Sequence, residues 1–171
     1  MAQRRVSDFS CKRVTRTTRT SYDVVLERLN KEIQIKGPAN PDALKPSSST
    51  SKDNFTEYFE THSGPSGFIQ FHEFDHGQWM RLFNVGSGLK IKRVLLGNPF
   101  IAIKMLERDL DTGLHVPVEI LLKELDGGRG TEIIYVLPTS LIGSENPDTK
   151  LQQAAKELES KLDSLTTYIA F

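Results

Sequence analysis

Two short apolar stretches joined by a glycine-rich turn constrain the fold of this chain more than any other feature. Residues 118–125 and 131–137 are rich in β-branched and other apolar side chains, and the segment Asp126–Gly130 between them contains three glycines. Such a pair predicts an antiparallel β-hairpin, because glycine readily adopts the backbone angles that a tight turn requires. We therefore expect an antiparallel or mixed sheet.

The remaining segments predict the elements that surround this hairpin. Alternating or β-branched residues predict strands over residues 12–19, 68–75 and 89–96. Apolar residues at helical spacing predict helices over 22–35, from Pro99 onward and over 149–165, with shorter helical segments at 53–61 and 77–83. The expected fold class is α+β, with two layers: a mainly antiparallel β-sheet and helices packed on one face.

Two details of the predicted helices can be checked directly. Asn98 and Asp148 are expected to be N-caps, because each is a short polar residue immediately before a helical pattern. The helix that begins at Pro99 is expected to bury one apolar face, formed by Phe100, Ile103, Leu106 and Leu110.

The length and composition predict one domain with flexible parts. A chain of 171 residues is long enough for one substantial core. We expect a basic N-terminal extension at residues 1–10, followed by a single domain at residues 11–171. Residues 38–52 are rich in proline and serine and lack periodicity, so we expect a disordered loop there.

Charge and cysteine content exclude several classes of function. Basic and acidic residues both number 22, which gives no reason to expect a nucleic-acid or membrane partner. The first 20 residues carry six basic and one acidic side chain, so a mitochondrial transit peptide or a phosphate-binding arm is an alternative to the edge strand at 12–19. The single cysteine, Cys11, excludes an intrachain disulfide. We expect a cytoplasmic protein.

Residues 72–76 match the zinc-protease pattern H-E-x-x-H literally, but their context contradicts that interpretation. The zinc site requires a helix, which places both histidines on one face. Here the motif continues an alternating, aromatic segment that predicts a strand, where His72 and His76 would be about 13 Å apart at about 3.3 Å per residue. We therefore expect no metal at these histidines.

Five polar residues remain as candidate ligand-binding residues: His72, His76, Arg93, Asn98 and Tyr135. His76 follows a strand and is the one candidate for a catalytic base, although its ring could simply hydrogen-bond to the turn. Arg93 interrupts an apolar alternation, so it points toward the helical layer if the strand is regular, or toward solvent if the strand is bulged. Asn98 could help to hold an anion at a helix N-terminus, or act only as the cap.

Tyr135 and His72 are the weaker candidates. Tyr135 lies in a predicted strand and could face a cavity or be an ordinary core tyrosine. His72 is expected to share one strand face with Phe68, Gln70 and Phe74, and Glu73 to lie on the opposite face. No cofactor is expected, because the sequence contains no Walker A motif and no G-x-G-x-x-G motif.

The order of four short motifs resembles the family known as domain of unknown function 302. These motifs are Asp75-His76-Gly77, Gly97-Asn98-Pro99, Leu114-His115-Val116-Pro117-Val118 and Tyr135-Val136-Leu137-Pro138, within residues 67–165. The resemblance implies a TATA-binding-protein-like α+β fold that tends to form dimers and has no established activity.

The same resemblance suggests which polar positions matter and where this chain departs from the family. The polar landmarks of the family fall on His76, Asn98 and Pro117. The departures are a long insertion at residues 38–66 and the basic N-terminal extension. The resulting hypothesis is a homodimeric module that binds a small molecule or another protein. The alternative is an enzyme that acts on a small anionic substrate around His76, Arg93 and Asn98.

Overall fold

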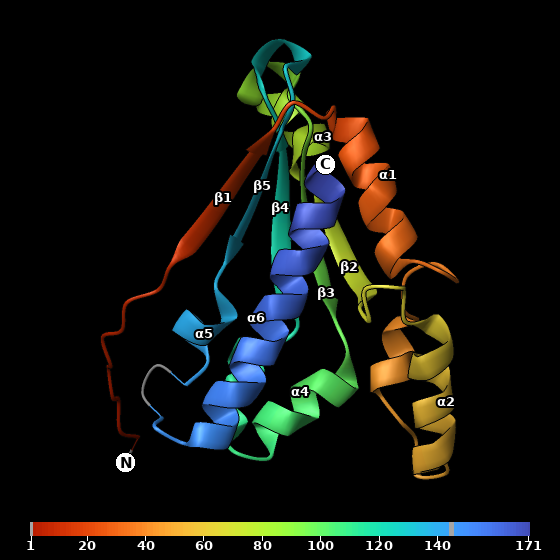
Figure 1. The fold of residues 1–171 in the computed structure, drawn as a ribbon, viewed down its shortest axis with the longest axis vertical. Helices are drawn as coiled ribbons and strands as arrows, with labels where there is room; N and C mark the ends of the chain where they lie inside the picture. The colour runs from red at the N-terminus through yellow and green to blue at the C-terminus, as the bar shows by residue number, and fades with distance from the viewer. Residues whose placement is uncertain (1, 144–145) are drawn as a thin grey trace.

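The chain folds around one five-stranded antiparallel sheet (Figure 1). The computed structural model describes residues 2–143 and 146–171. The strands are β1 (Arg13–Thr18), β2 (Ile69–Asp75), β3 (Ile91–Gly97), β4 (Val118–Glu124) and β5 (Thr131–Val136). Their order across the sheet is β1-β5-β4-β3-β2, and every neighbouring pair is antiparallel. The predicted hairpin is therefore confirmed as β4 and β5, and each of the other predicted strands is present.

The hairpin turn shows why its glycines are required. Gly127 and Gly128 have φ angles of +68° and +67°, which side chains with a Cβ rarely adopt. Gly130 has a φ of +140°, and a Cβ on it would lie 2.0 Å from the carbonyl oxygen of Thr18. This close approach allows the end of β1 to lie directly beside the start of β5.

The two longest helices cover one face of this sheet. The helices are α1 (Tyr22–Ile33), α2 (Lys52–His62), α3 (His76–Met80), α4 (Pro99–Leu106), α5 (Pro138–Leu141) and α6 (Thr149–Ala170), of which α3 lies at the opposite face. Figure 1 shows α1 and α6 lying across the same side of the strands. Asn98 and Asp148 are confirmed as N-caps, because their side-chain oxygens accept backbone N–H groups of α4 and α6. The structure has the predicted α+β architecture.

The main core lies between the sheet and these two long helices. It includes the buried stripe of α6, at Leu151, Leu158, Leu162 and Leu165, and the buried stripe of α1, at Val25, Leu29 and Ile33. From the sheet it receives alternate residues of the three central strands: Val94, Leu96, Ile120, Leu122, Ile133 and Tyr135. Because alternate residues of a strand face opposite sides, the intervening residues form a second face that these helices leave open.

This second face, called here the uncovered face, carries a mixture of apolar and charged side chains. Its central residues are Ile91, Arg93, Leu95, Glu119, Leu121, Ile134 and Val136. Of the two orientations left open for Arg93, the structure has the outward one, but without the bulge against β4 that was expected to accompany it. Strand β3 pairs in unbroken register with β4 but presents Val94 and Leu96 to the helices, so Arg93 lies on the other side and is exposed.

The expected buried face of α4 is also wrong. Ile103 is 48% exposed, and Leu110 is 81% exposed and lies beyond the end of the helix. The core contact instead comes from Met105, which is fully buried, and from Ile101, one turn before it. Helical spacing alone permits either face, and the direction in which α4 leaves β3 selects the Ile101–Met105 face.

The segment 38–52 contains some local structure. Pro41–Leu44 forms a short 3₁₀ turn, and Ala39 is buried in a second, smaller core cluster with Phe59 and Ile69. Most of the other residues of the segment are exposed. The disorder of this loop stays a prediction, as does the boundary of the basic extension at residue 10.

The length and hydropathy of the helices decide whether any of them can cross a membrane. In the described part of the chain, none of them combines the length and the hydropathy that such a span needs.

The two faces of the sheet should differ sharply in their sensitivity to truncation. Leu122 is fully buried under the helices, whereas its neighbour Leu121 lies half-buried on the uncovered face. We expect Leu122→Ala to lower the free energy of unfolding by about 2–5 kcal/mol, and Leu121→Ala by about 1 kcal/mol. Urea denaturation of the two variants measures the difference. Equal losses would contradict the assignment of the two faces.

Candidate functional site

A cavity lies between α2 and α4, beside the main core. Its volume is about 720 Å³, within the range of small-molecule pockets. We call it the α2–α4 cavity. Its apolar walls come from α2, β2, α4, the start of β4 and α6, and include Phe55, Phe71, Phe100, Ile101, Leu106, Val116 and Leu158.

Aromatic packing between α2 and α4 forms one wall of this cavity. The ring of Phe55 packs against Phe59 at 4.8 Å between centroids, and edge-on against Phe100 at 6.4 Å. Phe59 is fully buried and belongs to the second core cluster, whereas Phe55 and Phe100 are only half-buried. The cluster thus attaches α2 to the start of α4 while leaving two aromatic rings available to a ligand.

Polar groups are few in the α2–α4 cavity. Among the described residues that line it, only Lys52 and Glu107 are charged. Asn98 also lines it, but its polar atoms are engaged: its oxygen accepts the N–H of Phe100, and its amide donates to Ser63 Oγ and to the carbonyl oxygen of Gly67. Asn98 therefore fastens α4 to the loop before β2, and a ligand in this cavity would meet mainly apolar surface.

A second, shallower groove lies on the uncovered face of the sheet. It has a volume of about 460 Å³, and its lining includes His76, Trp79, Arg93, Glu119 and Leu121. Two of the candidate residues from the sequence, His76 and Arg93, therefore lie at one groove. Asn98 does not join them, because it lines the α2–α4 cavity, which shares no described lining residue with the groove.

Both groove residues already have neighbours. The guanidinium group of Arg93 donates to the carboxylate of Glu119 on β4, and it lies 5.9 Å from the ring centroid of Phe74. His76 is the first residue of α3, and its ring lies between Phe74 and Trp79, at 6.3 and 5.8 Å. Because Glu119 neutralises Arg93, an anion in this groove would have to displace a carboxylate. The catalytic role of His76 stays a prediction.

Tyr135 is buried in the main core. Its side chain is on the helical side of β5, and its hydroxyl group donates to Asp163 on α6 at 3.0 Å. Burial raises the pKa of Tyr135, which keeps the hydroxyl group protonated as a donor. Tyr135 borders the groove, but its polar end lies on the opposite side of the sheet.

A β-bulge changes the predicted faces of β2. The register of β2 against β3 shifts between Gln70 and His72, so these two residues lie on opposite faces rather than on one. His72 is exposed and packs edge-on against Phe74. Gln70 is buried, and it faces α1.

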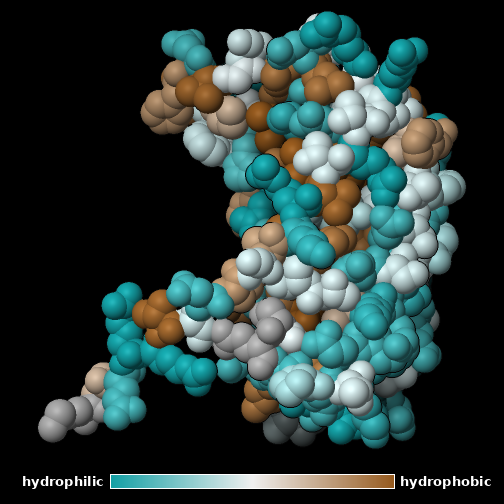
Figure 2. All heavy atoms as spheres, turned by 60° about the vertical axis from the view of Figure 1, so that its left-hand side comes forward, coloured by the Kyte–Doolittle hydropathy of each residue, from teal (hydrophilic) through white to brown (hydrophobic). Residues whose placement is uncertain are grey.

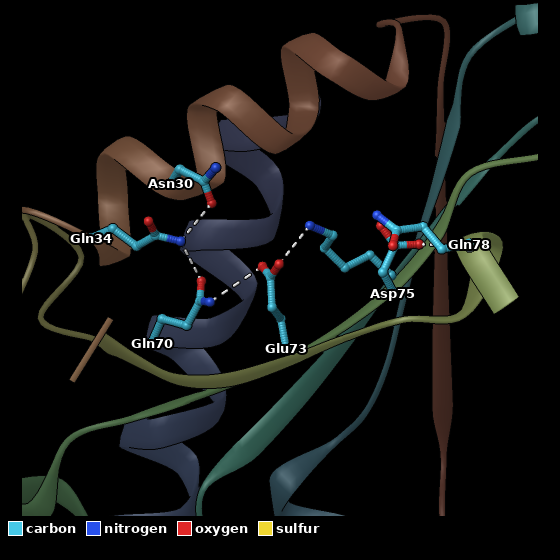
Figure 3. A network of polar contacts seen from close by, with 7 residues as sticks. Asn30, Gln34, Gln70, Glu73, Asp75 and Gln78 are labelled. Atoms are coloured by element: carbon cyan, nitrogen blue, oxygen red, sulfur yellow. Dashed lines mark hydrogen bonds and ion pairs between the residues drawn. The ribbon is translucent and has the colours of Figure 1, made fainter. Parts of the chain in front are cut away.

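The buried side of β2 carries a continuous polar network (Figure 3). Gln34, the C-cap residue of α1, donates to both Asn30 and Gln70. Gln70 donates to Glu73, and Glu73 pairs with Lys92 of β3 at 2.7 Å. These groups satisfy one another, which is how buried amides are normally accommodated. The network therefore links α1 to the edge of the sheet, and we assign it a structural role.

The H-E-x-x-H residues lie as the sequence predicted, with His72 in β2 and His76 at the start of α3. Within residues 2–143 and 146–171, no group of three or more His, Cys, Asp or Glu side chains is arranged to hold a metal ion. The absence of a bound metal stays a prediction.

Comparison with known proteins identifies the family to which the chain belongs. The model of the family described as "Domain of unknown function DUF302" matches residues 45–167, which is well over half of the sequence. The chain belongs to the DUF302 family. The resemblance inferred from the four motifs is therefore confirmed, and no curated protein matches the chain.

A solved structure supports the same fold. It is the uncharacterised conserved DUF302 protein from Bacillus stearothermophilus, with a TM-score of 0.62 and 19% sequence identity. The match covers 93% of this chain and 98% of that one. At this identity the likeness shows the fold alone, and neither comparison assigns an activity to the DUF302 domain. The likeness to the TATA-binding-protein fold stays a prediction.

Zinc binding by the H-E-x-x-H segment can be tested by measuring the metal content of the protein. Because His72 lies on a strand, we expect this DUF302 protein, purified without an affinity tag, to contain far less than one zinc per chain. Elemental analysis measures the content. About one zinc per chain that is lost in His72→Ala would show that the two histidines do form a site.

Proposed function

We propose that this DUF302 domain is a binding module for a small apolar molecule, held in the α2–α4 cavity. The observation that carries the proposal is the composition of the lining, which combines half-buried aromatic and aliphatic side chains with few polar groups. Apolar surface that is left hydrated is costly, at about 25 cal/mol per Å², so an apolar ligand that displaces this water gains free energy.

The position of the cavity supports the same function. It lies between the main core, which contributes Met105 to its walls, and the aromatic side chains that pack against the second cluster, of which Phe55 and Phe100 line it. Both walls are packed independently of the cavity, which favours a preformed pocket. By contrast, the enzyme alternative loses support, because His76, Arg93 and Asn98 do not converge on one cavity.

Affinity should rise with the length of an apolar ligand. For unbranched alcohols from hexanol to decanol, we expect each added methylene to tighten binding about fourfold, because burying one methylene contributes about 0.8 kcal/mol. Titration calorimetry measures the series.

A cavity-filling variant tests the location. Ala102 lines the cavity, so Ala102→Phe should weaken decanol binding at least about tenfold by occupying the space. Lys104→Phe, on the same helix but outside the lining, is the matched control and should bind as the wild type does. Absence of binding to the wild-type protein, or equal binding to both variants, would contradict the proposed site.

We also propose that the domain acts as a homodimer through the uncovered face of the sheet. A solvent-facing side of an antiparallel sheet is normally polar, but this one has Ile91, Leu95, Leu121, Ile134 and Val136 at its centre. Figure 2 shows a hollow in the surface, with hydrophobic side chains on the lobe that projects above it. The segment around α3 adds further exposed apolar residues: Phe74, Trp79, Leu82, Phe83 and Val85.

The charges of this face favour a second copy of the same chain. Arg93 pairs with Glu119, and Lys123 pairs with Glu132 at 2.5 Å, so the central charges are neutralised within each copy. Two such faces related by a twofold axis can bring these paired central charges together without repulsion, while Arg13 lies on the edge strand β1 at the side of the groove.

A charge placed in the centre of the face should separate the dimer. We expect the wild-type protein to be dimeric and Leu121→Glu to be monomeric in size-exclusion chromatography with light scattering, because a dimer would bury the new carboxylate without a partner. The control is Val24→Glu, an exposed position on α1, which should remain dimeric. A monomeric wild-type protein would refute the proposal, as would a dimeric Leu121→Glu variant.

A further inference from the structure

The charged side chains at the α2–α4 cavity allow the class of ligand to be narrowed. A polar group carried deep into this cavity would lose its hydrogen bonds to water, and the polar atoms of Asn98 are already engaged there. The polar end of a ligand is therefore expected at the solvent-exposed rim, where the charged lining residues are Lys52 and Glu107. The sign of the charge it meets decides what that polar end can be.

Lys52 is the cation at this position. It is the first residue of α2, three residues before Phe55, so both side chains lie on the same side of the helix. Phe55 in turn packs against Phe100 at the start of α4. Lys52 and Phe55 therefore line the cavity from the same side of α2. Among the described residues, no carboxylate lies within ion-pair distance of the Lys52 ammonium group, whereas Lys45, which does not line the cavity, has Asp42 as such a partner.

Glu107, the other charged lining residue, lies at the opposite end of α4. It follows Leu106, the last residue of the helix, whereas Phe100 is in its first turn. Seven residues of helix separate the two positions by about 10 Å, at about 1.5 Å per residue. Glu107 therefore does not neutralise the Lys52 end, and it disfavours a negative group at its own end. This asymmetry gives a chain-like ligand one preferred direction.

We propose that the α2–α4 cavity binds an amphiphile with one carboxylate at the end of an apolar chain, with the carboxylate paired to Lys52. The apolar chain extends along Phe55 and Phe100 toward Leu106. This inference rests on the proposed ligand-binding function and adds to it the chemical class and the orientation of the ligand.

Decanoate and decanol distinguish the charge from the chain. At pH 7.5 and low ionic strength, we expect the wild-type protein to bind decanoate about five- to tenfold more tightly than decanol, because only the carboxylate can pair with the ammonium group. In Lys52→Gln, decanoate should lose this advantage, while decanol binding should remain unchanged. Titration calorimetry measures all four affinities.

A matched control separates Lys52 from a general effect of surface charge. Lys45 is exposed, pairs with Asp42 and does not line the cavity, so Lys45→Gln should keep the preference for decanoate. Ala102→Phe should weaken both ligands together, which places the carboxylate and the chain in the same cavity.

The outcomes separate this inference from the function on which it rests. If neither decanoate nor decanol binds, the proposed function fails, and this inference fails with it. If both bind equally well and Lys52→Gln changes neither, the cavity binds apolar molecules but the carboxylate class is refuted. If decanoate binds as well to Ala102→Phe as to the wild type, its site lies elsewhere and the inference is equally refuted.

Discussion

The packing of α1 and α6 against one face of the sheet is the constraint on which the rest of this structure depends. The buried stripes of the two helices, with Leu29 and Leu162 near their centres, need apolar partners, and the central strands supply them from alternate positions. Once Leu96 and Leu122 face the helices, their neighbours must face the other way. This single choice makes Arg93 a surface residue and leaves Leu121 half-exposed.

Two surfaces are left over by that packing, and they have different characters. The uncovered face is open and apolar at its centre, with charges paired within it, which suits contact with a large and similar surface. The α2–α4 cavity exists because α2 packs on β2 through Phe59, rather than joining the main core. The packing of Phe55 against Phe59 and Phe100 joins α2 to the start of α4, and the cavity lies beside this contact.

Several polar residues that look functional in the sequence have their polar atoms engaged within the domain. The side-chain oxygen of Asn98 caps α4, and its amide nitrogen donates to the loop before β2. The hydroxyl group of Tyr135 donates to Asp163. The H-E-x-x-H match is divided between a strand and the helix that follows it. Lys52, by contrast, belongs to no motif, and only its place beside Phe55 and Phe100 draws attention to it. In this domain the tertiary contacts of a polar residue decide whether its polar atoms are available to a ligand.

The sequence by itself determined the local elements, because the periodicity of apolar residues, the glycines of the 126–130 turn and the caps Asn98 and Asp148 act within a few residues of the chain. It also determined the family, because the order of the four motifs can be recognised in the sequence alone. Only the tertiary structure decided which face of β3 is buried, which side of α4 meets the core, and where the bulge after Gln70 turns His72 outward. An alternating strand has two faces, and the pattern alone does not say which of them is buried. That depends on helices that are distant in sequence. The α2–α4 cavity could not be predicted from the sequence for the same reason. Its walls come from six segments between Leu44 and Leu158, and no local sequence pattern indicates that these segments meet.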